Sequence, residues 1–506
     1  MEVNEHWSVD ASFDGGDLDC GSGLLLLIRR HIDPLPAGGV LRLHSTDATV
    51  ETDLPAWCRL TGNELLGLQR TGERRTYWIS KGPRKSAADS NRPPPTTSAT
   101  ANQSHASTLT SVSAALSGSK ESSVSPRIAP PPTVASPTVT PPIMPLSITG
   151  IGSWPRPRWL LTAIHERLSG RMDERAFHET ADDAVRLCVA AQARAGVDIV
   201  TDGEQRRDSY ASFVGALLDN CQLVPITDLL AYVDDPEEFA RELKALDVPA
   251  EEVRHPAVFG PLRRSRPLAV DEFRFVRRID PRPVKIALPG PYLLTRTMWL
   301  ECVTDRAYAT RESLAADIVR VLREELLELL AAGVSIVQFD EPVLSEVAFG
   351  AATHRRSFMC GALSERRAVG EELELARSLL SAVLEGVPRE RTALHVCRGN
   401  WSRDESLALT GGYEPLADTL RAIPVGTYFL EMCTPRAGEW DVLRRLPDEA
   451  RIGVGMLNPK SDRVESVEEL SAAITRAIGL FGRDRVLLNP DCGFATFADN
   501  PVNSAD

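Results

Sequence analysis

Short apolar runs rich in β-branched residues recur along the chain from residue 146 onward, and each run ends in small or polar residues. Segments with a 3.6-residue hydrophobic period separate the runs, for example 180–195 and 314–332, and this period predicts amphipathic helices. Strands that alternate with helices indicate parallel βα units. Eight such runs over about 360 residues predict a (β/α)8 TIM barrel, an α/β fold, with strands at 147–152, 198–202, 284–289, 334–340, 392–396, 427–431, 451–456 and 486–489.

The first 83 residues have a different order of elements and predict a separate small domain. The apolar run 24–31 indicates a buried helix, and Asp53 with Pro55 has the pattern of an N-cap and first turn, which predicts a second helix there. The expected order βαβαββ indicates an α+β two-layer domain. Its strands are expected at 7–11, 40–43, 64–69 and 76–79.

A Ser-, Thr-, Pro- and Ala-rich stretch separates these two regions. Residues 84–145 contain no Phe, Tyr or Trp and include the run Pro93-Pro94-Pro95. Such a segment cannot bury enough apolar surface to offset its chain entropy, so it predicts a disordered linker. We therefore expect a small domain at 1–83, the linker at 84–145 and the barrel at 146–506, with an additional helical or hairpin insertion within 211–280.

The composition is that of a globular protein without a membrane span. Of the 506 residues, 43% are hydrophobic and 25% are charged, and the apolar run 24–28 is too short to cross a bilayer. A net charge of −13 argues against a nucleic-acid-binding face. Nine scattered cysteines, with no secretory signal, indicate reduced thiols rather than a disulfide framework. We expect a cytoplasmic protein with neither nucleic acid nor membrane as a partner.

Side chains able to bind a metal ion follow several of the expected strands, at the end of a βα barrel where functional sites lie. His395 and Cys397 are two residues apart, so their side chains leave the strand on the same face. With Cys492 and Glu431, at the ends of two other strands, they have the donor set of a tetrahedral zinc site. Glu431 suits the exchangeable position, because a carboxylate leaves more easily than a thiolate.

Each of these residues also has a simpler structural interpretation. A single His-x-Cys pair on a strand is mostly core packing, and Cys492 would then be a small buried apolar residue. Glu204 and Asp340, at the ends of two further strands, would be surface ion-pair residues. Their shared position at one end of one barrel favours a functional site.

Five motifs of the barrel region form a specific pattern: Ile151-Gly152-Ser153, Asp202-Gly203-Glu204, Gln338-Phe339-Asp340-Glu341-Pro342, His395-Val396-Cys397-Arg398-Gly399-Asn400 and Asn489-Pro490-Asp491-Cys492-Gly493. With these motifs in this order, over most of 146–498, the sequence resembles the catalytic C-terminal barrel of cobalamin-independent methionine synthase.

The resemblance implies a zinc-dependent methyltransferase that transfers a methyl group to the thiol of homocysteine and gives methionine. The substrate thiol would take the position of Glu431. The substrate ammonium would pair with Glu204 and Asp340, and the substrate carboxylate would be placed by Ile151 and Ser153. The implied Zn²⁺ ligands are His395, Cys397, Glu431 and Cys492.

The sequence departs from the family pattern on the side of the methyl donor. Full-length family members carry an N-terminal barrel that helps to bind a polyglutamyl folate, and this sequence has no counterpart of it. Thr297, with Trp299 nearby, stands where the family has a tryptophan that stacks on the folate. Lys460 stands at the position of the family's proton-donating histidine, and it would act as a catalytic acid only if burial lowers its pKa. A methyl-folate and a methyl-corrinoid protein both stay open as the donor.

The region 1–83 is similar to TusA-type sulfur-carrier domains. Those domains place a cysteine at the start of the first helix, where the helix dipole favours the thiolate. Leu18-Asp19-Cys20-Gly21 would supply it here, although Gly21 stands where a proline is expected. The resemblance implies that Cys20 carries sulfur and that sulfur-relay proteins are partners. In the alternative, Cys20 is a turn residue of a docking domain.

Two other functions compete with homocysteine methylation. An alkyltransferase acting on another thiol would keep the zinc ligands and lose the contacts to an amino acid. A sulfur-relay or adaptor protein would use the TusA-like region and offer the barrel as a partner surface. Glu204 and Asp340 favour a thiol that carries an amino group.

Overall fold

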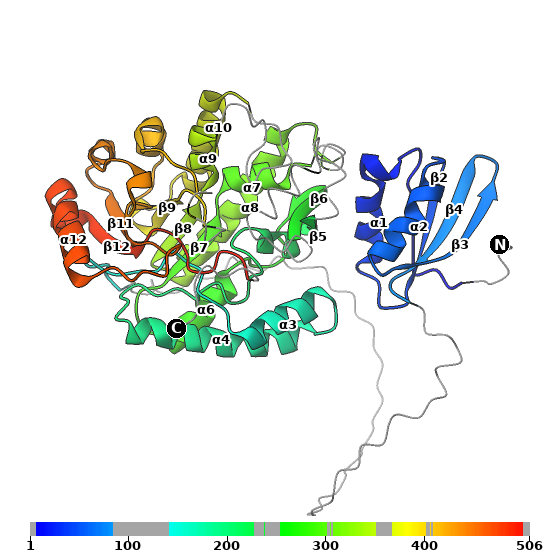
Figure 1. The fold of residues 1–506 in the computed structure, drawn as a ribbon, viewed down its shortest axis with the longest axis horizontal. Helices are drawn as coiled ribbons and strands as arrows, with labels where there is room; N and C mark the ends of the chain where they lie inside the picture. The colour runs from blue at the N-terminus through cyan, green and yellow to red at the C-terminus, as the bar shows by residue number, and fades with distance from the viewer. Residues whose placement is uncertain are drawn as a thin grey trace, which may run out of the picture.

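The computed structural model describes residues 7–83, 141–226, 237, 254–300, 304, 307–350, 367–400, 405 and 408–498 (Figure 1). The linker expected at 84–145 lies outside the described residues except for 141–145. Within the described part of the chain, every helix is too short or too polar to span a bilayer.

A parallel sheet with the strand order β12-β11-β10-β9-β8-β7 forms the centre of the larger region. The runs 147–152 and 198–202 lie between its two outer strands and are joined to them and to each other by isolated parallel bridges, which close the sheet into a barrel. The predicted βα barrel is therefore confirmed, but its first two strands are reduced to bridges. The six longer strands are β7 (Lys285–Pro289), β8 (Ile336–Asp340), β9 (Thr392–Val396), β10 (Thr427–Leu430), β11 (Arg451–Leu457) and β12 (Val486–Pro490).

The barrel strands are buried on both faces, which explains their continuous apolar runs. A cluster of apolar side chains from six of the runs fills part of the barrel interior: Ile151, Ile199, Ile336, Ala393, Phe429 and Leu487. A closed parallel barrel is normally filled by side chains in this way.

Helices surround this barrel (Figure 1). The predicted helix 180–195 is α4 and begins earlier, because the Asp173 side chain accepts a hydrogen bond from Ala176 N and caps it. The predicted helix 314–332 is α8, which starts in a capping box at Thr310 and ends at Gly333. The α-helices whose bounds fall within the described residues are α3 (Arg158–Leu168), α4 (Glu174–Arg194), α6 (Val270–Ile279), α7 (Pro291–Met298), α8 (Arg311–Ala332), α9 (Val343–Phe349), α10 (Val369–Leu384), α11 (Ala417–Ala422) and α12 (Val467–Phe481). The 3-10 helices described there are η3 (Ser212–Ala216), η6 (Arg389–Arg391), η8 (Glu414–Leu416), η9 (Pro435–Ala437), η10 (Asp441–Arg445) and η11 (Arg483–Arg485).

The insertion expected within 211–280 contains an antiparallel hairpin. Its strands are β5 (Asp219–Pro225) and β6 (Arg254–Arg263), with a register shift between Asp219 and Cys221. The expected insertion is thus confirmed, and its described part is an antiparallel pair of strands.

The N-terminal region has a sheet of order β1-β2-β4-β3, in which only the β1–β2 pair is parallel. The first strand lies later than the expected 7–11. The second helix begins at Val50 rather than Asp53, because Val50, Leu54 and Trp57 form one buried face with Pro55 inside the helix. The elements are β1 (Ala11–Asp14), η1 (Cys20–Leu24, a π-helical turn), α1 (Leu25–Ile32), β2 (Val40–Ser45), α2 (Val50–Leu60), β3 (Glu64–Thr71) and β4 (Arg74–Ser80).

Candidate metal centre

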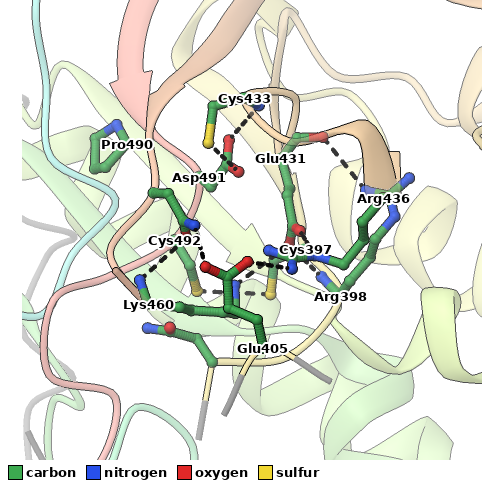
Figure 2. A network of polar contacts seen from close by, with 12 residues as sticks. Cys397, Arg398, Glu405, Glu431, Cys433, Arg436, Lys460, Pro490, Asp491 and Cys492 are labelled. Carbon is green, nitrogen blue, oxygen red and sulfur yellow. Dashed lines mark hydrogen bonds and ion pairs between the residues drawn. The ribbon is translucent and has the colours of Figure 1, made fainter. Parts of the chain in front are cut away.

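Three of the four predicted metal ligands meet at the carboxyl end of the barrel. His395 and Cys397 lie at the end of β9, and Cys492 follows β12. One ligand atom from each lies within 4.8 Å of the other two, and all three side chains are buried. The two sulfur atoms are 3.6 Å apart. Figure 2 shows both cysteines pointing toward one another from separate strands.

The His395 ring is oriented for metal binding. Its Nδ1 lies 3.1 Å from the carbonyl oxygen of Phe429, so a neutral ring donates there and keeps the lone pair on Nε2. Nε2 is buried and has no hydrogen-bond partner among the described residues. A buried acceptor of this kind is costly unless a ligand satisfies it.

Cys397 and Cys492 form a thiol pair, in which each thiol alters the ionisation of the other. The Cys492 thiol donates toward Cys397, and this contact together with His395 holds the pKa of Cys397 well below that of an ordinary thiol. The same contact and burial raise the pKa of Cys492. A thiolate, a second thiol and an imidazole nitrogen are the donor set that a soft divalent ion such as zinc prefers, so these residues fit a zinc ion.

Glu431, the fourth predicted ligand, is turned toward cations in this structure. Its Oε2 accepts a hydrogen bond from Arg398 N at 2.8 Å and lies 3.8 Å from Lys460 Nζ. Its Oε1 accepts from Arg436 Nε at 2.9 Å (Figure 2). Burial alone would raise its pKa, but Lys460, Arg398 and Arg436 hold the pKa below its ordinary value. The prediction that Glu431 binds the metal is not tested by this arrangement and stays a prediction.

Lys460 is nearly inaccessible to solvent and lies beside the thiol pair. Burial would lower its pKa, but Glu431, Cys492 and Cys397 outweigh burial and raise it. Lys460 therefore lacks the lowered pKa that proton donation by a lysine requires, and its role as a catalytic acid stays a prediction. The ammonium group instead neutralises the carboxylate and thiolate charge around it.

Asp491 links the loops that carry Glu431 and Cys492. Its Oδ1 accepts hydrogen bonds from Met432 N at 2.8 Å and Cys433 N at 3.0 Å, and its Oδ2 accepts from Cys433 Sγ at 2.8 Å. Cys433 thus lies outside the metal cluster and holds a neighbouring loop. Our sequence reasoning missed Asp491, although it stands inside the quoted motif directly before Cys492.

The predicted substrate-binding residues line the same pocket as the metal cluster. Ile151, Ser153, Glu204 and Asp340 lie around one cavity with His395, Cys397 and Cys492. Burial raises the pKa of Glu204 to about 7 and the pKa of Asp340 to about 6. Glu204 Oε2 is buried without a hydrogen-bond partner in the described part of the chain. Two such carboxyl groups suit a ligand that brings its own positive charge.

The backbone is strained where it presents Glu204. This residue has a φ of 53°, a left-handed backbone conformation that residues other than glycine seldom adopt. Gly152 gives the carboxylate its room, because a Cβ atom there would collide with Glu204 Oε1. Strain of this kind is concentrated at functional sites, where the surrounding structure maintains it.

Cys20 of the N-terminal region lies at the start of the first helical turn and is buried. Burial, followed by the charges of Asp53, Asp19 and Asp47, raises the pKa of its thiol to about 12. These surroundings oppose the thiolate that a sulfur carrier needs. The TusA-like assignment and the role of Cys20 stay predictions.

Relatives of known name share this barrel. Residues 146–505 match the family described as the cobalamin-independent synthase, catalytic domain. A methionine synthase of Thermococcus kodakarensis is 29% identical over 355 residues, which are 70% of this chain and 87% of the relative. A methionine synthase of Sulfolobus acidocaldarius is 26% identical over 352 residues, which are 69% of this chain and 85% of the relative.

Two solved structures have the same fold. A B12-independent methionine synthase from Shewanella sp. W3-18-1, in complex with selenomethionine, superposes with a TM-score of 0.52 at 24% identity over 69% of this chain and 91% of that one. A putative vitamin-B12 independent methionine synthase from Listeria monocytogenes superposes with a TM-score of 0.52 at 18% identity, over 72% of this chain and 95% of that one.

Fold and site together define a βα-barrel protein with a buried His and Cys cluster at the carboxyl ends of its strands. The chain belongs to the cobalamin-independent synthase catalytic domain family.

Proposed function

We propose that this protein is a zinc-dependent methyltransferase that methylates the thiol of homocysteine and gives methionine. The observation that carries the proposal is one cavity that holds both halves of a site for an amino-acid thiol. His395, Cys397 and Cys492 form the half that suits a thiol-binding metal, and Glu204 and Asp340 form the half that suits an ammonium group.

Zinc held by His395, Cys397 and Cys492 would lower the pKa of a bound thiol, so that a thiolate nucleophile exists at neutral pH. Glu431 would be the fourth residue to hold the ion, at the exchangeable position that suits the substrate thiol. The contacts of Glu431 with Arg436 and Arg398 N give the carboxylate a place to reside once it has left.

The rest of the pocket orients the amino acid. Glu204 and Asp340 receive the substrate ammonium. Because these carboxylates are fixed in place and replace the water around the ammonium, the bound amino acid is held in a single orientation. Ser153 Oγ accepts a hydrogen bond from Ala495 N at 3.3 Å, so its hydroxyl hydrogen is left to donate to the substrate carboxylate. Ile151 lines the same pocket, and its backbone would assist in placing the carboxylate.

The methyl donor in this proposal is a methyl-folate. The family is described as cobalamin-independent, which favours a folate over a methyl-corrinoid protein. Thr297, at the position of the folate-stacking tryptophan, is buried and donates its hydroxyl to Leu293 O at 2.8 Å. It offers no aromatic surface, so we expect this chain to bind the pterin differently from family members that have the tryptophan.

Metal analysis and a donor assay test the proposal. We expect about one zinc per chain, and Cys492→Ser should lose most of it, because structural thiolate ligands contribute strongly to metal affinity. Purified protein should methylate homocysteine with mono- or polyglutamyl methyl-folate. Full activity after thorough chelation, or methylation only with a methyl-corrinoid protein, would overturn the metal or the donor part of the proposal.

A further inference from the structure

A lysine is fully buried between the strands of the barrel. Lys285, the first residue of β7, has no solvent-exposed surface. Its Nζ donates a hydrogen bond to Gln338 Oε1 at 2.7 Å and lies 4.0 Å from the centre of the Phe429 ring. A buried ammonium is costly compared with an apolar side chain of the same size, so its presence calls for a role beyond packing.

The contacts of Lys285 determine how Gln338 is oriented. An ammonium group has only donors, so the Gln338 atom that faces it must be the amide oxygen. The amide nitrogen then points the other way, and it donates to Asp340 Oδ1 at 2.6 Å. Without Lys285, the amide could turn and present its oxygen to the Asp340 carboxylate, which would repel it.

Lys285 also balances the negative charge of the two carboxyl groups, Glu204 and Asp340, that would receive the substrate ammonium. Arg207 Nη1 is 3.8 Å from Glu204 Oε1, but Arg207 is committed to Glu272 through a contact of 2.6 Å. Burial lowers the pKa of Lys285 to about 7, and Asp340 and Glu204 oppose this change. The lysine therefore interacts electrostatically with the two carboxyl groups that line the pocket.

We propose that Lys285 is a positioning residue: through the amide of Gln338 it holds the Asp340 carboxylate in place for the ammonium group of the substrate. Lys285 thereby sets the preference of the site for thiols that carry an amino group. This inference rests on the proposed function and adds a specificity role for a residue that contacts neither metal nor substrate.

The test compares two thiols on zinc-loaded protein. The first is homocysteine, and the second is 4-mercaptobutanoate, which has the same thiol and carboxylate but no amino group. Lys285→Met keeps the length of the side chain and removes its donors. We expect it to weaken homocysteine binding, measured by calorimetry and as KM, by about ten- to one-hundredfold, the usual cost of a lost charge-assisted contact. The affinity for 4-mercaptobutanoate and the zinc content should stay unchanged.

Two further variants make the test decisive. Gln338→Met removes the amide and keeps Lys285, so it should reproduce the selective loss, and it can be measured even if Lys285→Met does not fold. Arg391→Met is the matched control, because Arg391 precedes β9 at the end of the barrel opposite the pocket. It should leave the preference between the two thiols unchanged.

The outcomes separate this role from the proposed function. Equal losses for both thiols in Lys285→Met, or no loss for either, would overturn the role of Lys285 alone. If the unaltered protein binds 4-mercaptobutanoate as tightly as homocysteine, the substrate in the proposed function is wrong and the role of Lys285 is overturned with it.

Discussion

Glu431 Oε1 accepts a hydrogen bond from Arg436 Nε at 2.9 Å, and in the proposed function this contact would compete with the metal for the same carboxylate. The chain after β10 turns back through η9, which brings Arg436 over Glu431. Arg436 is itself held by Glu405 at 2.9 Å. If Glu431 binds the metal as proposed, its carboxylate has a second partner in an arginine that is already in position.

We predict that Arg436→Leu binds zinc more tightly than the unaltered protein when no thiol is present. Loss of the arginine removes a charge-assisted contact, so about tenfold higher zinc affinity is expected in competition with a chelator. Arg445→Leu is the control, because Arg445 pairs with Glu414 at the surface. Weaker or unchanged zinc affinity in Arg436→Leu would show that Glu431 does not exchange between the two partners.

Homocysteine binding should depend on pH through Glu204. Burial raises the pKa of this carboxyl group to about 7, so it is largely neutral at pH 6 and largely ionised at pH 8. An ammonium group is attracted only by the ionised form, and affinity should therefore rise across this range. Calorimetry at several pH values measures the trend, and Glu204→Gln should weaken binding and reduce the rise to the part that comes from ionisation of the substrate thiol. A flat profile in the unaltered protein would contradict the assignment.

The Glu204 carboxyl group should also make the stability of the substrate-free protein depend on pH. Homocysteine affinity should rise with pH, but this contribution to stability should fall with pH. A carboxyl group whose pKa is raised on folding, here from 4.5 to about 7, favours folding fully below pH 4.5, and this contribution is lost as the pH rises through 7. Glu204→Gln removes the cost of ionisation and should raise the thermal midpoint at pH 8 more than at pH 5. An equal change at both pH values would mean that Glu204 titrates normally.

Glu325 should be a major stabilising residue of the barrel. This fully buried side chain of α8 accepts hydrogen bonds from Leu268 N, Ala269 N and Val270 N at the start of α6, and from Arg264. Glu325→Ala leaves these donors and a partly buried guanidinium without a carboxylate, and about 3–5 kcal/mol of stability should be lost. Denaturant unfolding measures the loss.

Glu328→Ala is the matched control for Glu325→Ala. Glu328 contacts the same Arg264 but is about one third exposed, with 34% of its side-chain surface accessible. A pair of this kind contributes about 1 kcal/mol or less. Similar losses for both variants would mean that the cap on α6 contributes little.

The residue pattern predicted the barrel and the gathering of most of the candidate site residues around one cavity, because the strand runs and their polar ends are local features of the sequence; the roles of these residues stay predictions. It did not predict the orientation of Glu431, which depends on Arg436 in the loop after β10. The pattern also could not show that the pKa of Lys460 depends on Glu431 and the two cysteines as well as on burial, and its role as a catalytic acid stays a prediction. Lys285 did leave a signal, since it is the only charged residue in the apolar run 284–289.

Cys20 gives a test of the N-terminal region that is independent of the barrel. With a thiol pKa of about 12, about one molecule in ten thousand carries the thiolate at pH 8, and burial restricts access further. Iodoacetamide should therefore label Cys20 at least about one-hundredfold more slowly in the native protein than in the urea-unfolded chain, with peptide mass spectrometry as the measurement. Cys20→Ser should leave methyl transfer to homocysteine unchanged, since the candidate metal centre lies in the barrel. Rapid labelling, or a persulfide on Cys20 after incubation with a sulfur donor, would instead support the sulfur-carrier role.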